Sequence, residues 1–195
     1  MPAVAAAESE GIPKNRTQPN IHICGNPGTG KTSLARKIAA KFDNLSYIDL
    51  GKEAKSRGCI ESFDDELDCD VVDHDKLVKK IEPELEAGGK VIDWIHADFW
   101  EPELIDLVVV LTCDNTVLFD RYKARGYNQK KIEQNMDSEI MQEIVTETRE
   151  YYEGDDEEEG ASPVTTVLKS DTDEDMASNL DRISTWISRW KPADP

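Results

Sequence analysis

The sequence predicts a doubly wound α/β domain, in which a parallel β-sheet carries helices on both faces. Three observations lead to this prediction. Short apolar segments alternate with amphipathic helical segments along the chain. One apolar segment, residues 107–111, has no polar position, as expected for a strand that is covered on both faces of a parallel sheet. A glycine-rich loop also separates the first expected strand from the first expected helix.

The glycine-rich loop spans residues 25–32, and its sequence GNPGTGKT fits the pattern G-x-x-x-x-G-K-[ST] at every fixed position. Residues 21–24 are expected to form a strand before it, and the helix after it should end near Phe42. In this setting the loop N–H groups and the helix N-terminus point at phosphate oxygens. We therefore expect a nucleoside triphosphate to bind with Mg²⁺ through Gly28, Thr29, Gly30, Lys31, Thr32 and Ser33.

Two of these residues have specific roles in such loops. Lys31 can reach the β- and γ-phosphates, and the Thr32 hydroxyl can ligate Mg²⁺. The alternative is a glycine-rich turn that binds nothing, but the strand and helix on its two sides favour the phosphate-binding interpretation.

The next expected elements follow in order. Residues 45–49 are expected to form a strand, residues 50–57 a short helix, and residues 58–70 an acidic, irregular segment. Asp73 is a suitable N-cap for a helix through about Ala87, in which Pro83 can introduce a kink or a break. Residues 91–94 are expected to form the third strand, ahead of the central strand at 107–111.

The C-terminal half continues the alternation. Helices are expected over 115–124 and over about 128–152, the second because apolar residues recur at four-residue spacing. An acidic loop at 153–162 precedes a fifth strand at 163–168, and a capping box at 172–175 begins the last helix. We expect one domain over residues 20–191, with a disordered extension at 1–19 and a short tail at 192–195.

The charge of the chain limits its partners. It carries 23 Lys and Arg against 41 Asp and Glu, which gives a net charge of −18. Direct binding to nucleic acid or to an anionic membrane is not expected, because both require a basic face. A basic protein partner suits this charge, although an acidic surface that only favours solubility is the commoner explanation.

Other sequence features indicate the compartment. The four cysteines lack zinc-site spacing, no secretory signal is present, and no apolar segment is long enough to span a membrane. We therefore expect a soluble, intracellular monomer.

A second group of candidate residues follows the strand at 91–94. Asp93 lies near its end, where an acidic residue next to a phosphate loop commonly holds Mg²⁺; the alternative is an ordinary Asp at a strand end. His96 and Asp98 come directly after it. His96 can polarise a phosphate or orient a water molecule, or it can be a loop histidine without a role.

A third group is a basic stretch in an otherwise acidic chain. Residues 121–131 contain five cations and no acidic residue. A solvated helix face is the ordinary explanation, but bound phosphates also need cations to offset their charge. We interpret residues 124–134 as a small mobile lid, with Arg125 as a phosphate clamp. The other expected lid cations are Arg121, Lys130 and Lys131.

Together these segments resemble the adenylate kinase isoenzyme-6 family. The resemblance rests on the phosphate loop and on the segments YIDLG (47–51), DHDK (73–76) and RYKARGY (121–127), with Asp93 and Asp98-Phe99 between them. It covers residues 20–152 strongly and the C-terminal part more loosely. It implies the P-loop nucleoside monophosphate kinase fold, with a five-stranded parallel sheet and a short lid.

The resemblance also implies an activity. Members are small adenylate kinases, which transfer a phosphoryl group reversibly from MgATP to AMP to give ADP. They are also implicated as ATPases in small ribosomal subunit maturation, which implies residence in the nucleus as well as the cytoplasm. Two alternatives stay open: an ATP-dependent assembly factor for a basic ribosomal protein with incidental kinase activity, and a P-loop kinase of another small acceptor.

By the same resemblance, residues 49–72 form the monophosphate-binding segment, with Asp49, Gly51 and Lys55 as AMP-binding residues. Two departures from the family pattern occur. Lys55 stands where related kinases carry an Arg, and His96 lies one position later than in the usual Asp-x-His. Either the loop shifts to bring His96 back, or its role is lost. The expected catalytic residues are Lys31, Asp93, His96 and Arg125.

Overall fold

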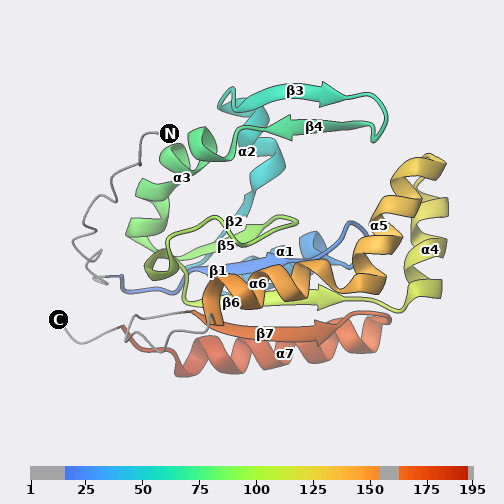
Figure 1. Cartoon of the computed structure of the whole chain (residues 1–195). Helices are drawn as coiled ribbons and strands as arrows, with labels where there is room; N and C mark the ends of the chain where they lie inside the picture. Colours follow the sequence, from blue (N-terminus) through green and yellow to red (C-terminus); the bar gives the residue numbers. More distant parts are fainter. Residues whose placement is uncertain (1–15, 154–162, 193–195) are drawn as a thin grey trace.

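A five-stranded parallel sheet forms the centre of the protein in the computed structural model, which describes residues 16–153 and 163–192 (Figure 1). The strand order is β2–β5–β1–β6–β7. The predicted α/β class and the number of strands are confirmed. The strands are β1 (Ile21–Cys24), β2 (Ser46–Asp49), β5 (Lys90–Asp93), β6 (Leu107–Thr112) and β7 (Val164–Lys169).

Helices cover both faces of this sheet, because alternate side chains of each buried strand point to opposite faces. One face packs against α1 (Lys31–Lys41) and α7 (Asp173–Arg189). The other face packs against α3 (His74–Ala87) and α6 (Glu143–Glu153), with α2 (Leu50–Ser56) at its margin. Within β1, Ile21 and Ile23 belong to the first layer and Cys24 to the second.

Several predicted helix details are confirmed. Asp73 caps α3 by accepting a hydrogen bond from the Lys76 N–H, and the helix continues through Pro83. Thr172 and Asp175 form the predicted capping box at the start of α7. The 3₁₀ turn η1 (Pro102–Leu104) leads into β6.

A third, smaller apolar cluster lies beyond the carboxyl end of β6. It joins α4 (Asn115–Ala124) to α5 (Gln129–Met141) through Leu118, Tyr122 and Ile132. These two helices carry the basic stretch of residues 121–131. The lid segment therefore rests on its own small core next to the sheet edge.

The prediction of an irregular segment over residues 58–70 is wrong. Strands β3 (Ile60–Asp64) and β4 (Cys69–Val72) pair there as an antiparallel hairpin. The Asp64 carboxylate accepts hydrogen bonds from the N–H groups of Glu66 and Leu67, both at 2.9 Å, and so fixes the turn. The hairpin is largely exposed, so its many acidic side chains are compatible with strand structure.

The prediction of one long helix over residues 128–152 is also wrong. Gln142 adopts a left-handed conformation, with φ of 53°, and ends α5 one residue before α6 begins. The two halves bury different surfaces: Ile132 packs against α4, whereas Ile144 packs against the sheet. The break at Gln142 lets α6 change direction, so that each half reaches its own packing partner.

The N-terminal side of the domain includes residues that we assigned to the extension at 1–19. Arg16 is buried and forms an ion pair of 2.9 Å with Asp106, and it donates a hydrogen bond to the Glu103 carbonyl. Residues 1–15 of that extension, residues 154–162 of the expected acidic loop and residues 193–195 of the tail lie outside the described residues.

The four cysteines are free thiols. No helix in the described part of the chain has both the length and the apolar character needed to cross a membrane.

Asn20 gives a test of how the sheet is anchored. Its buried side-chain amide donates to the carbonyls of Leu85 and Leu104, and its Oδ1 accepts from the Lys90 N–H. We expect Asn20→Ala to lower the free energy of unfolding by about 3 kcal/mol, because buried carbonyls lose their partners. Urea denaturation measures this change. Asn115→Ala, at an exposed position, should alter it by less than about 0.5 kcal/mol. Equal stabilities for the two variants would contradict the anchoring role.

Candidate functional site

The candidate site lies where three adjacent parallel strands end. Ile23 of β1 pairs with Asp93 of β5, and Asp93 pairs with Asp49 of β2. The phosphate loop leaves the end of β1, and α2 leaves the end of β2. The sheet register therefore brings the candidate metal ligand and the two expected nucleotide segments to one edge.

The loop conformation depends on glycine at two positions. A Cβ atom on Gly25, at φ of 131°, would lie 2.4 Å from the Leu111 carbonyl oxygen, so only glycine lets the loop pass β6. Gly30 is left-handed, with φ of 99°, and forms the N-cap of α1. The buried Thr29 hydroxyl donates to the Asn26 carbonyl at 2.9 Å. The Thr29 side chain therefore shapes the loop, which leaves its backbone N–H for the expected phosphate contact.

Lys31 lies against the loop and is only 8% exposed. Its Nζ donates to the Asn26 carbonyl at 2.9 Å. Burial lowers the pKa of Lys31 to about 8; the Asp93 carboxylate opposes this effect, and the positive charge of Arg125 adds to it. A bound phosphate would supply the negative charge that this buried ammonium group lacks.

Thr32 and Asp93 fit the expected Mg²⁺ site. Asp93 is 7% exposed, and its Oδ2 accepts hydrogen bonds from the Thr32 hydroxyl at 2.5 Å and the Tyr47 hydroxyl at 3.1 Å. Burial and the neighbouring Asp93 carboxylate raise the pKa of Tyr47, so the phenol stays a donor. Among the described residues, Asp93 has no cationic partner within ion-pair distance. Hydroxyl and carboxylate oxygens are the ligands that Mg²⁺ prefers. Ser33 is exposed on the same first turn of α1.

Arg121 binds the backbone of the phosphate loop, so in this structure it is not a free lid cation. Its Nη1 donates to the carbonyls of Gly28 and Ser170, both at 3.0 Å, and its Nη2 donates to the Asp171 carbonyl at 2.7 Å. It therefore joins the phosphate loop to the β7–α7 connection. In this arrangement its guanidinium is engaged by backbone carbonyls, and closure of Arg121 over a nucleotide stays a prediction.

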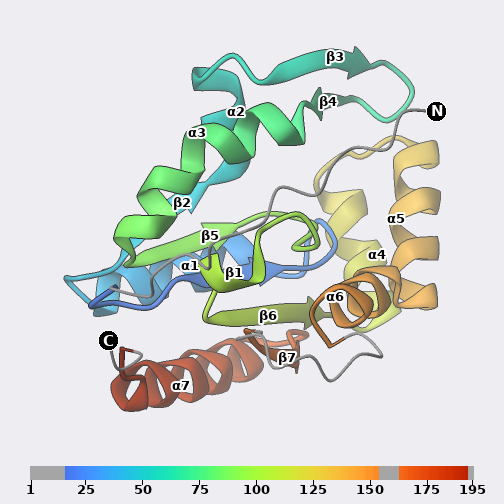
Figure 2. The same ribbon diagram turned by 60° about the vertical axis from the view of Figure 1, so that its left-hand side comes forward.

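The other lid cations divide into two kinds. Arg125, at the C-terminal end of α4, is exposed, and the structure shows no side-chain partner for it among the described residues. Lys130 instead pairs with Glu66, and Lys131 Nζ donates to the Asp68 carbonyl at 2.8 Å. Lys130 and Lys131 thus reach the turn of the β3–β4 hairpin, which lies next to the start of α5 in both ribbon views (Figure 2).

The expected AMP-binding residues lie in α2 and at its N-cap. Asp49 is its N-cap, accepting the Lys52 N–H at 3.2 Å; its pKa is lowered by hydrogen bonds and charge from Lys52, although burial acts in the opposite sense. Gly51 lies beside the Trp94 indole, where an added Cβ would be 3.4 Å from a ring atom. The exposed Lys55 forms a 2.7 Å ion pair with Asp70 of β4.

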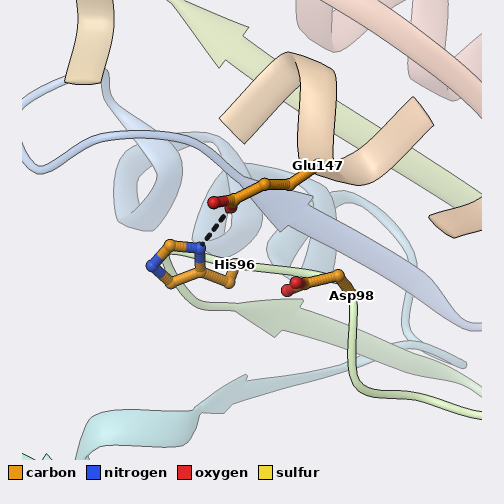
Figure 3. A group of neighbouring side chains, drawn as sticks. All are labelled: His96, Asp98 and Glu147. Carbon is orange, nitrogen blue, oxygen red and sulfur yellow. Dashed lines mark hydrogen bonds and ion pairs between the residues drawn. The ribbon is translucent and has the colours of Figure 1, made fainter. Parts of the chain in front are cut away.

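His96 lies in the connection that follows β5. Its Nδ1 is 3.0 Å from Glu147 Oε2 on α6, and Asp98 is close to both (Figure 3). The Gly25 N–H donates to the Ile95 carbonyl at 2.9 Å, so this connection is fixed to the first residue of the phosphate loop. The imidazole is therefore paired with a carboxylate that the sequence alone did not associate with it.

Glu139 of α5 was missed by the sequence reasoning. It is 9% exposed, and its carboxylate accepts hydrogen bonds from Asn26 Nδ2 at 2.9 Å and from the Cys113 N–H at 2.7 Å. It links the helix after the lid to the phosphate loop and to the end of β6. The sequence did contain a signal for this buried carboxylate. Glu139 follows Ile132 by seven residues and Met136 by three, which places an acidic residue on the apolar face of the helix.

Comparisons with known proteins agree with this geometry. Residues 21–142 match the family described as "AAA domain". The chain is 42% identical over 189 residues to adenylate kinase isoenzyme 6 homolog HBR1 of Candida albicans, covering 92% of this chain and 73% of that protein. It is 39% identical over 180 residues to adenylate kinase isoenzyme 6 homolog FAP7 of Saccharomyces cerevisiae, covering 92% and 87% of the two chains.

Solved structures support the fold alone, since their sequences are distant. Shikimate kinase from Bacteroides thetaiotaomicron superposes with a TM-score of 0.54 at 18% identity, covering 87% of this chain and 98% of that one. A sugar kinase from Janibacter gives 0.54 at 12% identity, covering 88% and 95%. The P-loop kinase fold and the sequence relatives lead to the same conclusion: the chain belongs to the adenylate kinase isoenzyme 6 family.

Proposed function

We propose that the protein transfers a phosphoryl group reversibly from MgATP to AMP, giving two ADP. The observation that carries this proposal is the two-sided site at the sheet edge. The phosphate loop occupies one side, α2 and the hairpin occupy the other, and Asp93 lies between them in register with both β1 and β2. The names of the sequence relatives support the same activity.

The donor side holds the triphosphate by charge and position. Lys31 would exchange its hydrogen bond with the Asn26 carbonyl for one to a phosphate oxygen. Thr32 and Asp93 would hold Mg²⁺, which offsets phosphate charge when it is bound. Arg125 has no competing partner among the described residues and would neutralise charge that develops in the transition state. No general base is needed, because positioning and charge neutralisation dominate this chemistry.

The acceptor side contains polar groups that a monophosphate can use. Lys55 is paired with Asp70, so an entering phosphate would compete for its ammonium group. The buried Trp94 Nε1 has no hydrogen-bond partner among the described residues, and the indole lies beside Gly51. These groups support AMP as the acceptor, with the Lys55 point charge in place of a bidentate Arg.

The expected lid segment and the β3–β4 hairpin are in contact with each other. Asn128 Nδ2 donates to the Glu66 carbonyl at 3.0 Å, and Lys131 donates to the Asp68 carbonyl. Closure of these two segments over bound nucleotides would exclude water and favour transfer to AMP over hydrolysis.

A second candidate function is an ATP-dependent assembly factor for a basic small-subunit ribosomal protein, acting in nucleus and cytoplasm. The observation that favours it is the net charge of −18, together with the exposed acidic residues of the hairpin. Most of the acidic segment 153–159 lies outside the described residues.

Turnover with different acceptors tests the kinase. ADP formation from MgATP should rise strongly when AMP is added, and AMP should exceed CMP, UMP, dAMP and non-nucleotide alcohols as acceptor. Lys31→Ala should reduce turnover at least about 100-fold, the scale for loss of one preorganised electrostatic contact. Lys37→Ala, at an exposed position of α1, should retain turnover. If none of the monophosphates accepts phosphate, the proposal fails.

The protonation of Lys31 gives a test of the donor side that does not depend on turnover. Its pKa of about 8 leaves a substantial neutral fraction at about pH 8.5, whereas a bound triphosphate would raise the pKa and protonate it. Nucleotide binding at this pH should therefore take up protons. Calorimetric titration in two buffers of different ionisation enthalpy measures the uptake. Equal apparent binding enthalpies in both buffers would contradict the placement of Lys31 at the phosphates.

The assembly-factor candidate has its own test. Binding to a basic ribosomal protein should weaken with added salt and should change with ATP. Binding that responds to neither would count against that function and would leave the kinase proposal untouched.

A further inference from the structure

A cluster of three side chains lies beside the phosphate loop, outside the expected Mg²⁺ site. His96, Asp98 and Glu147 each offer one ligand atom, and these atoms lie within 4.8 Å of one another. Figure 3 shows Glu147 reaching from α6 toward the imidazole, with Asp98 on the other side of the same space. A tetrahedral ion with metal–ligand distances of about 2.0–2.2 Å holds its ligand atoms roughly 3.4 Å apart, so side-chain rotations of about 1 Å would bring all three atoms onto one ion.

The charges in this cluster are unbalanced. Two carboxylates lie close together, and among the described residues their ion-pair partners include no Lys or Arg. Within residues 16–153 and 163–192, His96 is the only ion-pair partner of Glu147, and it offers a positive charge only when it is protonated. A divalent cation would remove the repulsion between Asp98 and Glu147 and would use the imidazole in its neutral form.

The cluster is also held together by the surrounding structure. The Tyr152 hydroxyl, on the same helix as Glu147, donates at 2.6 Å to the carbonyl of Ala97, which lies between the other two members. Tyr152 and Ala97 are both buried in the core. The Gly25–Ile95 hydrogen bond fixes the other end of this connection to the phosphate loop. The backbone that carries the three side chains is therefore fixed by contacts outside the cluster.

We propose that His96, Asp98 and Glu147 form a second divalent-metal site, selective for a transition-metal ion such as Zn²⁺ over Mg²⁺. Imidazole nitrogen favours Zn²⁺, whereas Mg²⁺ prefers an oxygen octahedron such as Thr32 and Asp93 can supply. The side chains of His96 and Glu147 are 39% and 43% exposed, so ions and water can reach the site. Three protein ligands leave a coordination position open. This inference does not depend on AMP being the acceptor.

Calorimetric titration of the full chain with Zn²⁺, without nucleotide and with excess Mg²⁺, tests the proposal. We expect one Zn²⁺ per chain and a melting temperature that rises with Zn²⁺, because the ion binds the folded state. His96→Ala and Glu147→Gln should each weaken binding at least about tenfold, since loss of even an outer partner of a metal ligand has that effect. Glu150→Gln, on the same helix, is the matched control and should bind as the unaltered protein does.

A further variant separates this site from an accidental thiol site. Cys69 is a free, partly exposed cysteine, and Cys69→Ser should leave Zn²⁺ binding unchanged. The proposal is overturned if Zn²⁺ does not bind in the presence of Mg²⁺, if Cys69→Ser abolishes binding, or if His96→Ala and Glu147→Gln bind as tightly as Glu150→Gln. Because turnover is not the readout, these outcomes are independent of the kinase assay.

Discussion

The parallel pairing of β1 with β5 is the constraint on which the candidate site depends. It places Asp93 in register with the last residues before the phosphate loop, so that the Thr32 hydroxyl reaches its carboxylate. The strands can pair in this way because both are covered on two faces and carry apolar residues toward α1 and α3. A shift of one residue in this register would turn the Asp93 side chain to the opposite face, away from Thr32, and remove the oxygen pair that suits Mg²⁺.

Asn26 provides hydrogen-bond partners for the polar groups of the phosphate loop. Its carbonyl accepts hydrogen bonds from Lys31 and Thr29, and its side chain donates to Glu139. The Lys31 ammonium group and the Thr29 hydroxyl therefore share one acceptor within the loop. Since Glu139 belongs to α5, a displacement of that helix would change the support of Asn26. This contact provides a physical route between the lid and the phosphate loop.

The sequence predicted the elements whose signals are local, and missed those that depend on tertiary contacts. The phosphate loop, the caps at Asp73 and Thr172 and the apolar strand β6 each rest on neighbouring residues, and the structure agrees with them. The hairpin was missed because its acidic residues hide the short apolar contact that Ile60 and Val72 make with the core, although the Asx turn at Asp64 was a usable signal. The break at Gln142 could not be read from spacing, because the apolar pattern continues across it while the packing partner changes.

The contrast between local signals and tertiary contacts also applies to the roles of the lid cations. From the sequence, the basic stretch was interpreted as a source of positive charge for phosphates, because five cations without an acidic residue are unusual in a chain of net charge −18. In the structure, Arg121 is occupied by backbone carbonyls, and Lys130 and Lys131 bind the acidic hairpin turn. Lys130 and Lys131 therefore tie the start of α5 to the hairpin, whereas Lys123 and Arg125 form no ion pair with the described residues. Composition could reveal the basic stretch, but assigning its members required the positions of Glu66 and Asp68 in space.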